Sequence, residues 1–168
     1  MVNKCIDTYT KKRCEMFDKK LENIVVDARM ESIVNRKFEQ CFEDGTFKWA
    51  IGIALETKRI DVIKEAILRS GNPGQMLSYT YTLATGTVHS KDFRTEILAM
   101  LLEVYEDGGD DKLKNGDHDY YKIAKCQFAL NQPVATAELL KKLACGSEEQ
   151  HEDLIAFQIA FDVVEKEN

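Results

Sequence analysis

The sequence predicts an all-α protein made of tandem antiparallel helical hairpins that form a segment of an α-solenoid or rod. Apolar residues recur at helical spacing along the chain, proline occurs twice, and no stretch alternates apolar and polar residues long enough for a strand. A short pattern of small and large apolar residues also repeats. Tandem helix pairs that cannot bury their apolar faces alone are typical of solenoids. We therefore expect residues 1–168 to be a single helical repeat segment of a longer protein.

The first two helices are expected at residues 2–16 and 27–42, separated by a polar connection. Each range carries apolar residues at a three- and four-residue spacing, which places them on one face of a helix. Gly45 is expected to end the second helix in the left-handed conformation, and Thr46 to cap the next. The expected inward residues are Val2, Cys5, Ile6, Tyr9 and Arg13, then Met30, Ile33, Val34, Phe38, Cys41 and Phe42.

The clearest unit is a pair of short helices on either side of Lys58 and Arg59. Two helices joined by so short a connection must lie antiparallel, as a helical hairpin, although the turn contains no helix-breaking residue. The inward residues follow the i, i+3, i+4 spacing of an amphipathic helix. They are Phe47, Ala50, Ile51, Ala54 and Leu55 in the first helix, and Ile60, Ile63, Ala66 and Ile67 in the second.

Two further helices are expected at residues 73–85 and after Ser90. Proline at the first turn of a helix costs no hydrogen bond, and Pro73 occupies such a position. The boundary signals are Gly71 and Asn72 before the first of these helices, and Gly86 and Ser90 before the second. The expected inward residues are Met76, Leu77, Thr80, Tyr81 and Ala84, then Phe93, Ile97, Leu98, Leu101, Leu102 and Tyr105.

Residues 107–117 break the helical pattern. They hold three glycines and mostly charged or polar residues, with almost nothing to bury. This composition predicts a mobile acidic surface loop.

The last helices are expected on either side of residues 131–133 and from Ser147 onward. Ser147 and Gln150 have the spacing of a capping box. The expected inward residues are Tyr121, Ile123, Ala124 and Phe128, then Val134, Ala137, Leu140 and Leu143, and finally Leu154, Ile155, Ile159, Phe161 and Val163. The repeating pattern aligns residues 49–55 with 124–130 and 155–161, and the helix pair is incomplete after the third copy.

Composition excludes several classes of function. The formal net charge of −6 disfavours nucleic-acid binding, which depends on lysine and arginine at the phosphates. No apolar run approaches the roughly 20 residues that span a bilayer, and no apolar signal core follows Met1. The five cysteines are odd in number and form no C-x-x-C pair, so reduced thiols in a cytoplasmic and nuclear protein are expected. These cysteines are Cys5, Cys14, Cys41, Cys126 and Cys145.

No catalytic, cofactor-binding or metal-binding residue is assigned. The three histidines lie in or beside polar turns without paired-ligand spacing. A calcium loop with Gly116 at its sixth position would place Leu113 at a ligand position, so that site is rejected. Cys126 lies about two turns from His118, too far for a thiol and its base, so a buried structural cysteine is favoured. The histidines are His89, His118 and His151, and the Gly108–Gly109 pair lacks the context of a phosphate-binding loop.

Trp49 is the only tryptophan, and its role has two interpretations. Packing between neighbouring hairpins is favoured, and anchoring of a partner protein is the alternative. The same two interpretations apply to Tyr79, Tyr81, Tyr120 and Tyr121, and no partner-binding residue is assigned.

Several stretches resemble the family of the largest non-ATPase scaffold subunits of the 26S proteasome regulatory particle. The most specific is residues 50–61, AIGIALETKRID. The others are residues 4–11, 28–35, 73–79 and 156–162, in the same order as in the family. The resemblance implies a helical rod without enzymatic activity, which holds regulatory-particle subunits together in ubiquitin-dependent degradation. It implies other subunits of the particle as partners, with no cofactor, small-molecule substrate, nucleic acid or membrane.

Two other functions remain open at this stage. A tetratricopeptide-like peptide-binding adaptor is the main alternative, although the W-x-x-L-G-x-x-Y signature is absent. An enzyme would require a pocket with converging polar groups near Cys126 or His118.

Overall fold

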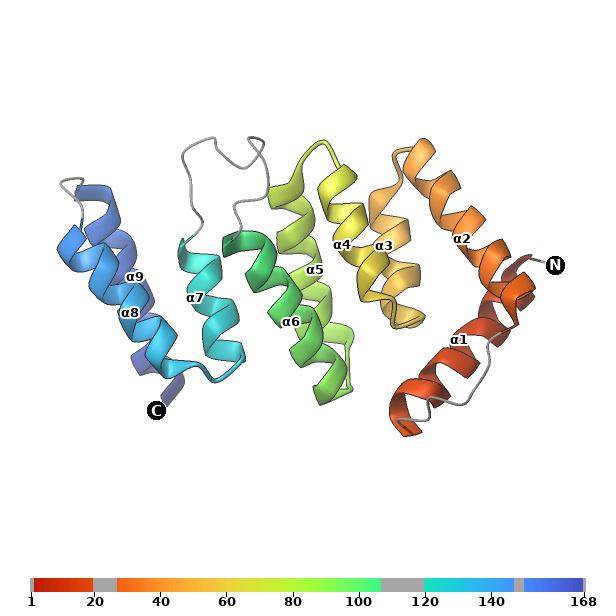
Figure 1. Ribbon diagram of the computed structural model, residues 1–168. Coiled ribbons are helices and arrows are strands. Elements are labelled where there is room, and N and C mark those ends of the chain that lie inside the picture. Colours follow the sequence, from red (N-terminus) through yellow and green to blue (C-terminus); the bar gives the residue numbers. More distant parts are fainter. Residues whose placement is uncertain (1, 20–26, 107–119, 147–149, 168) are drawn as a thin grey trace. The chain divides into compact units, whose positions relative to one another are not determined.

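The computed structural model describes residues 2–19, 27–106, 120–146 and 150–167, and these form helices joined by turns (Figure 1). The all-α prediction is confirmed for this part of the chain, which contains no strand. The chain divides into two compact units, Met1–Phe93 and Arg94–Asn168. The predicted loop at 107–117 lies outside the described residues, and the single-segment organisation stays a prediction.

The first unit holds five complete helices and the start of a sixth. From α1 to α5 each helix packs against the next, and α2 also contacts α4 while α3 contacts α5. Contacts with both the next and the next-but-one helix are those of antiparallel pairs laid side by side. The helices are α1 Val2–Lys19, α2 Ala28–Glu43, α3 Phe47–Glu56, α4 Ile60–Arg69, α5 Pro73–Thr87 and α6 Lys91–Glu106.

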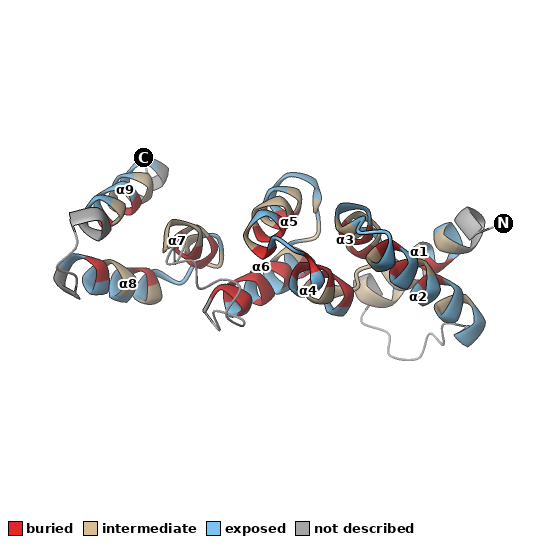
Figure 2. Cartoon of the chain, turned by 90° about the horizontal axis from the view of Figure 1, so that it is seen from above, coloured by how far each residue is buried: buried red, intermediate tan, exposed pale blue. Residues whose placement is uncertain are grey.

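The core of the first unit lies between these helices, shown in red in Figure 2. Tyr9, Val34, Ile51, Ile63 and Leu77 are all fully buried. Three alanines with no exposed surface, Ala50, Ala54 and Ala66, lie on the packed faces of α3 and α4. Small side chains at these positions let the helix backbones approach closely.

The second unit holds the rest of α6 together with α7 Tyr120–Ala129, α8 Pro133–Gly146 and α9 Gln150–Glu167. Helices α7, α8 and α9 pack mutually. Their shared core consists of Ala124, Leu143, Ala156 and Ile159, with partly buried Tyr120, Tyr121, Leu139, Leu140, Ile155 and Val163 packed around it.

Three of the turns have the same backbone geometry. Gly45, Lys58 and Asn131 have φ of 68°, 52° and 55°. In each turn the next residue donates its N–H to the carbonyl five residues back, as in Thr46 to Cys41, Arg59 to Ala54 and Gln132 to Gln127. This is a Schellman motif, in which one left-handed residue closes a helix and a new helix starts two residues later. The Asn131 turn confirms the predicted turn at 131–133.

These turns also fix how the two hairpins correspond. If Lys58 is matched to Asn131, then Ala54 falls opposite Gln127, two residues away from the Ala129 predicted by the sequence repeat. The burial agrees, because Ala54 and Gln127 are buried while Ala129 is exposed. The sequence alignment was therefore wrong in register, because it matched alanines that lie on different faces of their helices.

Several predicted helix ends and inward residues are also corrected. Thr46 precedes α3, but its hydroxyl donates back to the Cys41 carbonyl at 3.1 Å and caps no N–H of α3. Gly86 does not stop α5, which continues to Thr87.

The predictions of inward residues were wrong at five positions. Val134, Ala137, Leu154 and Phe161 are exposed, and Ile33 is 39% exposed. By contrast, the predicted cap is confirmed at Asn72, whose side chain accepts from the N–H of Gln75 at 3.2 Å.

Two glycine-to-alanine substitutions are expected to change stability in opposite directions. Gly45→Ala should lower the free energy of unfolding by about 1 kcal/mol, because an added Cβ disfavours the left-handed φ of 68°. Gly52→Ala should raise it by about 0.5–1 kcal/mol, because Gly52 lies within α3 and no atom lies within 4 Å of its added Cβ. Urea unfolding of both variants tests this pair, and equal shifts of the same sign would contradict it.

Candidate functional site

The densest polar constellation in the described residues centres on Arg59, in the turn between α3 and α4. Its guanidinium donates to the Asp61 carboxylate, from Nε to Oδ1 at 2.8 Å and also from Nη2. Nη1 donates to the Tyr9 hydroxyl of α1 at 3.1 Å and to Asn35 Oδ1 of α2 at 3.2 Å. Glu31 of α2 adds an ion pair at 3.8 Å. One side chain thus connects three helices that are distant in sequence.

The electrostatics of Arg59 follow from this geometry. Its side chain is only 13% exposed, so its charge needs partners. The hydrogen bonds that Arg59 donates to the Asp61 carboxylate raise the pKa of Arg59 above its usual value, against the opposing effect of burial, and the hydrogen bond to the Tyr9 hydroxyl adds to the rise. The hydrogen bond from Arg59 in turn lowers the pKa of Asp61 below its usual range. Both groups are therefore held in their charged forms.

A second set of contacts joins α1 to the end of α3. Arg13 donates from Nε to the Thr57 carbonyl at 3.4 Å and from Nη2 to the Lys58 carbonyl at 3.3 Å. The Cys14 thiol donates to the Glu56 carbonyl at 3.5 Å. Carbonyls at the end of a helix lack intrahelical partners and carry the negative end of the helix dipole, so a cation is favoured there. Arg13, which was expected on the inward face of the first helix, thus has a tertiary role.

Aromatic contacts lie beside the contacts between α1 and the end of α3. Phe17 of α1 meets Phe93 of α6 edge to face, with ring centroids 5.4 Å apart. The Lys58 ammonium lies 4.4 Å from the Phe17 ring centroid and 5.9 Å from that of Phe93. These cation–π contacts explain how a lysine is accommodated at a left-handed backbone position that disfavours it. Since its groups are stable ion pairs and capped carbonyls, the constellation serves to hold α1, α2, α3 and α4 together.

The acid sensitivity of this constellation follows from Asp61. Because the folded-state pKa of Asp61 is lowered, its ion pair stabilises the fold above the unfolded pKa of about 3.9, and this stabilisation is lost as pH falls through the folded pKa. Asp61→Asn should therefore destabilise the chain at pH 7 and progressively less as pH falls below about 4. Unfolding titrations from pH 7 to pH 2.5 check this, and a pH-independent difference between variant and wild type would contradict it.

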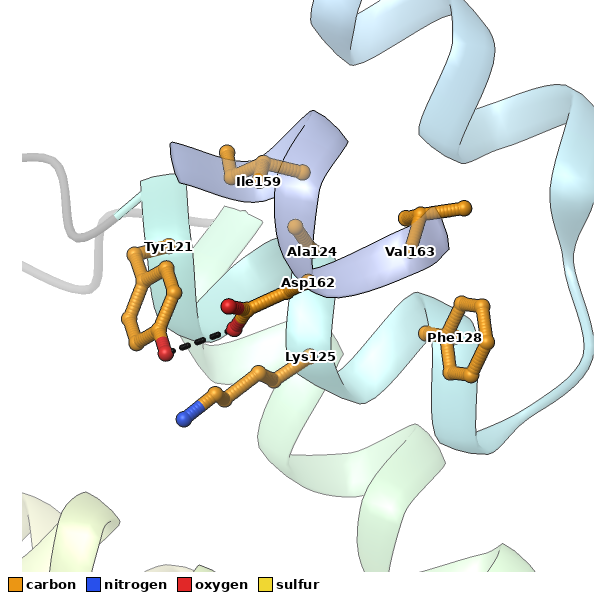
Figure 3. A pocket seen from close by; sticks show the side chains of 7 residues that line it. All are labelled: Tyr121, Ala124, Lys125, Phe128, Ile159, Asp162 and Val163. Atoms are coloured by element: carbon orange, nitrogen blue, oxygen red, sulfur yellow. Dashed lines mark hydrogen bonds between the residues drawn. The ribbon is translucent and has the colours of Figure 1, made fainter. Parts of the chain in front are cut away.

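The second unit contains a small pocket between α7 and α9 (Figure 3). The Tyr121 hydroxyl donates to Asp162 Oδ2 at 2.7 Å, and Lys125 lies 4.2 Å from the Tyr121 ring centroid. Ala124, Phe128, Ile159 and Val163 form the rest of the lining. The polar groups in this pocket satisfy one another, which indicates a structural link between two helices.

A larger groove, of about 280 Å³, lies at the turn between α7 and α8. Its lining is mostly apolar, with Asn131, Gln132 and Thr136 as the polar members and no lysine or arginine. The apolar lining residues are Phe128, Pro133, Ala137, Leu140 and Val163. Among the described residues of its lining there is no acidic or basic side chain, and the Thr136 hydroxyl donates to the Gln132 carbonyl at 3.1 Å, so the groove mainly offers space for an apolar group.

The candidate residues from the sequence are not brought together. His89 is exposed, and the side chains of His118 and His151 lie outside the described residues, as does the rejected calcium loop. Cys126 is fully buried, and Cys14, Cys41 and Cys126 take part in no disulfide bond. Within the described residues, no three acidic, histidine or cysteine side chains are grouped to hold a metal.

Exposed apolar side chains mark where the described surface departs from that of a solvated helix. Trp49 is 72% exposed, so the favoured prediction that it packs between hairpins is wrong.

Helix α9 exposes four large side chains, Leu154, Phe157, Phe161 and Val164, each at least 59% accessible. Leu154 and Phe161 were expected to be inward, so this face was not predicted from the sequence. The opposite placement of Ile159 and Ala156 on the helical wheel is the signal that could have revealed it.

In the part of the chain that the structure describes, no helix is both long and apolar enough to cross a membrane.

Comparisons with known proteins agree with the resemblance seen in the sequence. Residues 1–168 match the family described as "26S proteasome subunit RPN2, N-terminal domain". The chain is 39% identical over 165 residues to "26S proteasome non-ATPase regulatory subunit 1" of Drosophila melanogaster, covering 98% of this chain and 15% of the relative. It is 36% identical over 168 residues to "26S proteasome non-ATPase regulatory subunit 1 homolog A" of Arabidopsis thaliana, covering 100% of this chain and 16% of the relative.

A fungal relative gives the same result. The "26S proteasome regulatory subunit RPN2" of Candida glabrata is 33% identical over 170 residues, covering 98% of this chain and 17% of the relative. The chain thus spans only 15–17% of the length of these curated relatives. The expectation of a protein without enzymatic activity agrees with the names of the first two relatives, which describe non-ATPase regulatory subunits.

Proposed function

Because the chain belongs to the family of the 26S proteasome subunit RPN2, N-terminal domain, we propose that it is a structural scaffold segment of the proteasome regulatory particle. In this role it performs no catalysis and makes protein–protein contacts with other subunits of the particle, among the base and lid, during ubiquitin-dependent degradation. The match to the family over all of residues 1–168 is the observation that carries the proposal. The proposed location is the cytoplasm and nucleus.

Such a scaffold acts by keeping its helices in fixed positions relative to their neighbours. A helical array transmits position between partners only if its helices do not slide past one another. The partly buried Arg59 guanidinium, hydrogen-bonded to side chains of α1 and α2, opposes sliding in the first unit. The Arg13 contacts to the carbonyls at Thr57 and Lys58 oppose rotation of α1. Directional hydrogen bonds fix register more strictly than apolar contacts, which tolerate repacking.

The alternative function is a tetratricopeptide-like adaptor that binds peptides. Such a module would present basic or amide side chains along a groove that accepts an extended chain. The groove near the α7–α8 turn has Asn131 and Gln132 at its edge but an otherwise mostly apolar lining without a cation. The scaffold function is therefore preferred.

The test of the proposed function is purification of the full-length protein with an affinity tag under conditions that keep the proteasome intact. We expect stoichiometric amounts of regulatory-particle subunits in the eluate, identified by mass spectrometry. Chemical crosslinks from lysines of this segment, such as Lys64 and Lys122, should then join it to those subunits. A full-length protein that elutes without proteasome subunits would refute the proposal.

A further inference from the structure

Lys58 is the unusual member among the three turns that are closed by a left-handed residue. The other two positions are occupied by Gly45 and Asn131, and glycine and asparagine are residue types that adopt this conformation readily. Lysine has no such preference, yet Lys58 has a φ of 52°. A side chain keeps its backbone in a disfavoured conformation only where the surrounding structure holds it there, so the strain at Lys58 requires an explanation.

Two aromatic rings from different helices surround the Lys58 ammonium. Its Nζ lies 4.4 Å from the ring centroid of Phe17, near the end of α1, and 5.9 Å from that of Phe93, in the first turn of α6. Both distances fall within the roughly 6 Å over which a ring attracts a cation. The two rings also meet edge to face, with centroids 5.4 Å apart. One positive charge therefore contacts two helices at the α3–α4 turn.

The other contacts of α1 with this turn do not use the charge of Lys58. Arg13 and Cys14 donate hydrogen bonds to backbone carbonyls of residues 56–58. Both residues lie three or more positions before Phe17, towards the start of α1. The contact with the Lys58 ammonium therefore lies nearer the end of α1 than these hydrogen bonds do, and it is the one that depends on a lysine side chain.

The second unit shows that the turn itself does not need a lysine. Asn131 has a φ of 55°, close to the 52° of Lys58, and the hydrogen bond that closes each of the two turns is 2.9 Å long. An asparagine side chain carries no charge. The turn thus forms with the same geometry without a cation, so the positive charge at Lys58 serves its contacts with the rings.

We propose that Lys58 is a charge-dependent latch, which holds the last turn of α1 beside the first turn of α6 and releases the end of α1 when its charge is removed. Acetylation of lysine removes the charge and with it the attraction to a ring, while the aliphatic chain stays in place. In that reaction Nζ forms a bond to the acyl carbon of a thioester, and the carbon–sulfur bond breaks. The ammonium loses two protons, one to the departing thiol and one to water. The latch lies within the first unit and does not depend on the proposed function.

A second cation–π contact in the same unit provides the matched control. Nζ of Lys48, in α3, lies 5.4 Å from the ring centroid of Tyr79, in α5. Lys48 is exposed and lies in regular helix, so its backbone is not strained. Removal of its charge should leave α1 unaffected.

Hydrogen exchange of the full-length protein, followed by mass spectrometry, tests the latch. Acetyllysine incorporated at Lys58 during synthesis should speed amide exchange in residues 14–19 about tenfold, while exchange in α3 and α4 stays unchanged. Acetyllysine at Lys48 should leave residues 14–19 as in wild type. Lys58→Arg keeps a cation that binds aromatic rings, and it should also exchange like wild type. Unchanged exchange in residues 14–19 on acetylation of Lys58, or an equal increase throughout α1–α5, would overturn the proposal.

A double-mutant cycle identifies the ring on which the charge acts. Lys58→Met keeps an unbranched apolar side chain without the charge, and Phe17→Leu keeps an apolar side chain without the ring. Each variant alone should speed exchange in residues 14–19. The double variant should exchange no faster than Phe17→Leu, because the charge then has no ring of α1 to attract. If the two effects multiply instead, Lys58 acts on the turn independently of Phe17 and the latch is refuted.

Discussion

Arg59→Ala is expected to lower the free energy of unfolding by about 2–3 kcal/mol. The substitution removes the donor for the Tyr9 hydroxyl, which belongs to a fully buried residue, and leaves Asp61 without its cation. The Asp61 side chain is 63% exposed and can be solvated, so the loss stays below that of a fully buried ion pair. Chemical denaturation monitored by circular dichroism measures the change.

Arg69→Ala is the matched control for this substitution. Arg69 also bridges α2 and α4, through Glu39 at 3.1 Å, but its side chain is 48% exposed. Its replacement should cost less than about 1 kcal/mol, as is usual for surface ion pairs. Arg59→Lys should fall between the two, since an ammonium keeps the charge but lacks the planar fork that grips Asp61 through two nitrogens while a third reaches Tyr9 and Asn35. Equal effects of Arg59→Ala and Arg69→Ala would show that burial of the guanidinium contributes nothing.

Ala54→Leu is expected to lower the free energy of unfolding by about 2 kcal/mol or more. Ala54 has no exposed surface and lies on the face of α3 that packs in the core with Ala50 and Ile51. A larger side chain there would force α3 away from the neighbouring helices. Thermal unfolding of the variant should show a melting temperature lowered by several degrees.

Ala129→Leu provides the control and tests the register of the repeat. The sequence pattern alone pairs Ala54 with Ala129, which would make both substitutions equally damaging. The turns pair Ala54 with Gln127, and Ala129 is exposed, so Ala129→Leu should change stability by less than about 0.5 kcal/mol. A large destabilisation by Ala129→Leu would contradict the register defined by the turns.

The helices themselves could be predicted from the sequence because their signals are local. The spacing of Phe47, Ala50 and Ile51 and the positions of Asn72 and Pro73 depend only on residues a few positions away. The left-handed turn at Lys58 could not be predicted from a breaker residue, since lysine is not one. It is held by the hydrogen bonds at the end of α3 and by Phe17, a contact 41 residues away in sequence.

The contacts of Arg59 could not be predicted from the sequence either, because they also join residues that are far apart along the chain. An arginine in a polar turn looks solvated, and only the fold brings Tyr9 and Asn35 to it, from 50 and 24 residues away. The faces of α9 were misassigned for a different reason. Apolar residues on both sides of a helix do not reveal which side packs within the same protein, so Leu154 and Phe161 were placed inward beside Ile159.

The contacts of α1 with the α3–α4 turn also bear on synthesis at the ribosome. Arg13 binds the Thr57 carbonyl, 44 residues further along the chain, so α1 leaves the exit tunnel before its docking site exists. At about 5–20 residues per second, the nascent helix waits roughly 2–9 s for that site. During this interval α1 carries an unpaired tyrosine and arginine and is open to chaperones. Helix α1 is thus synthesised before the turn that receives it in the first unit.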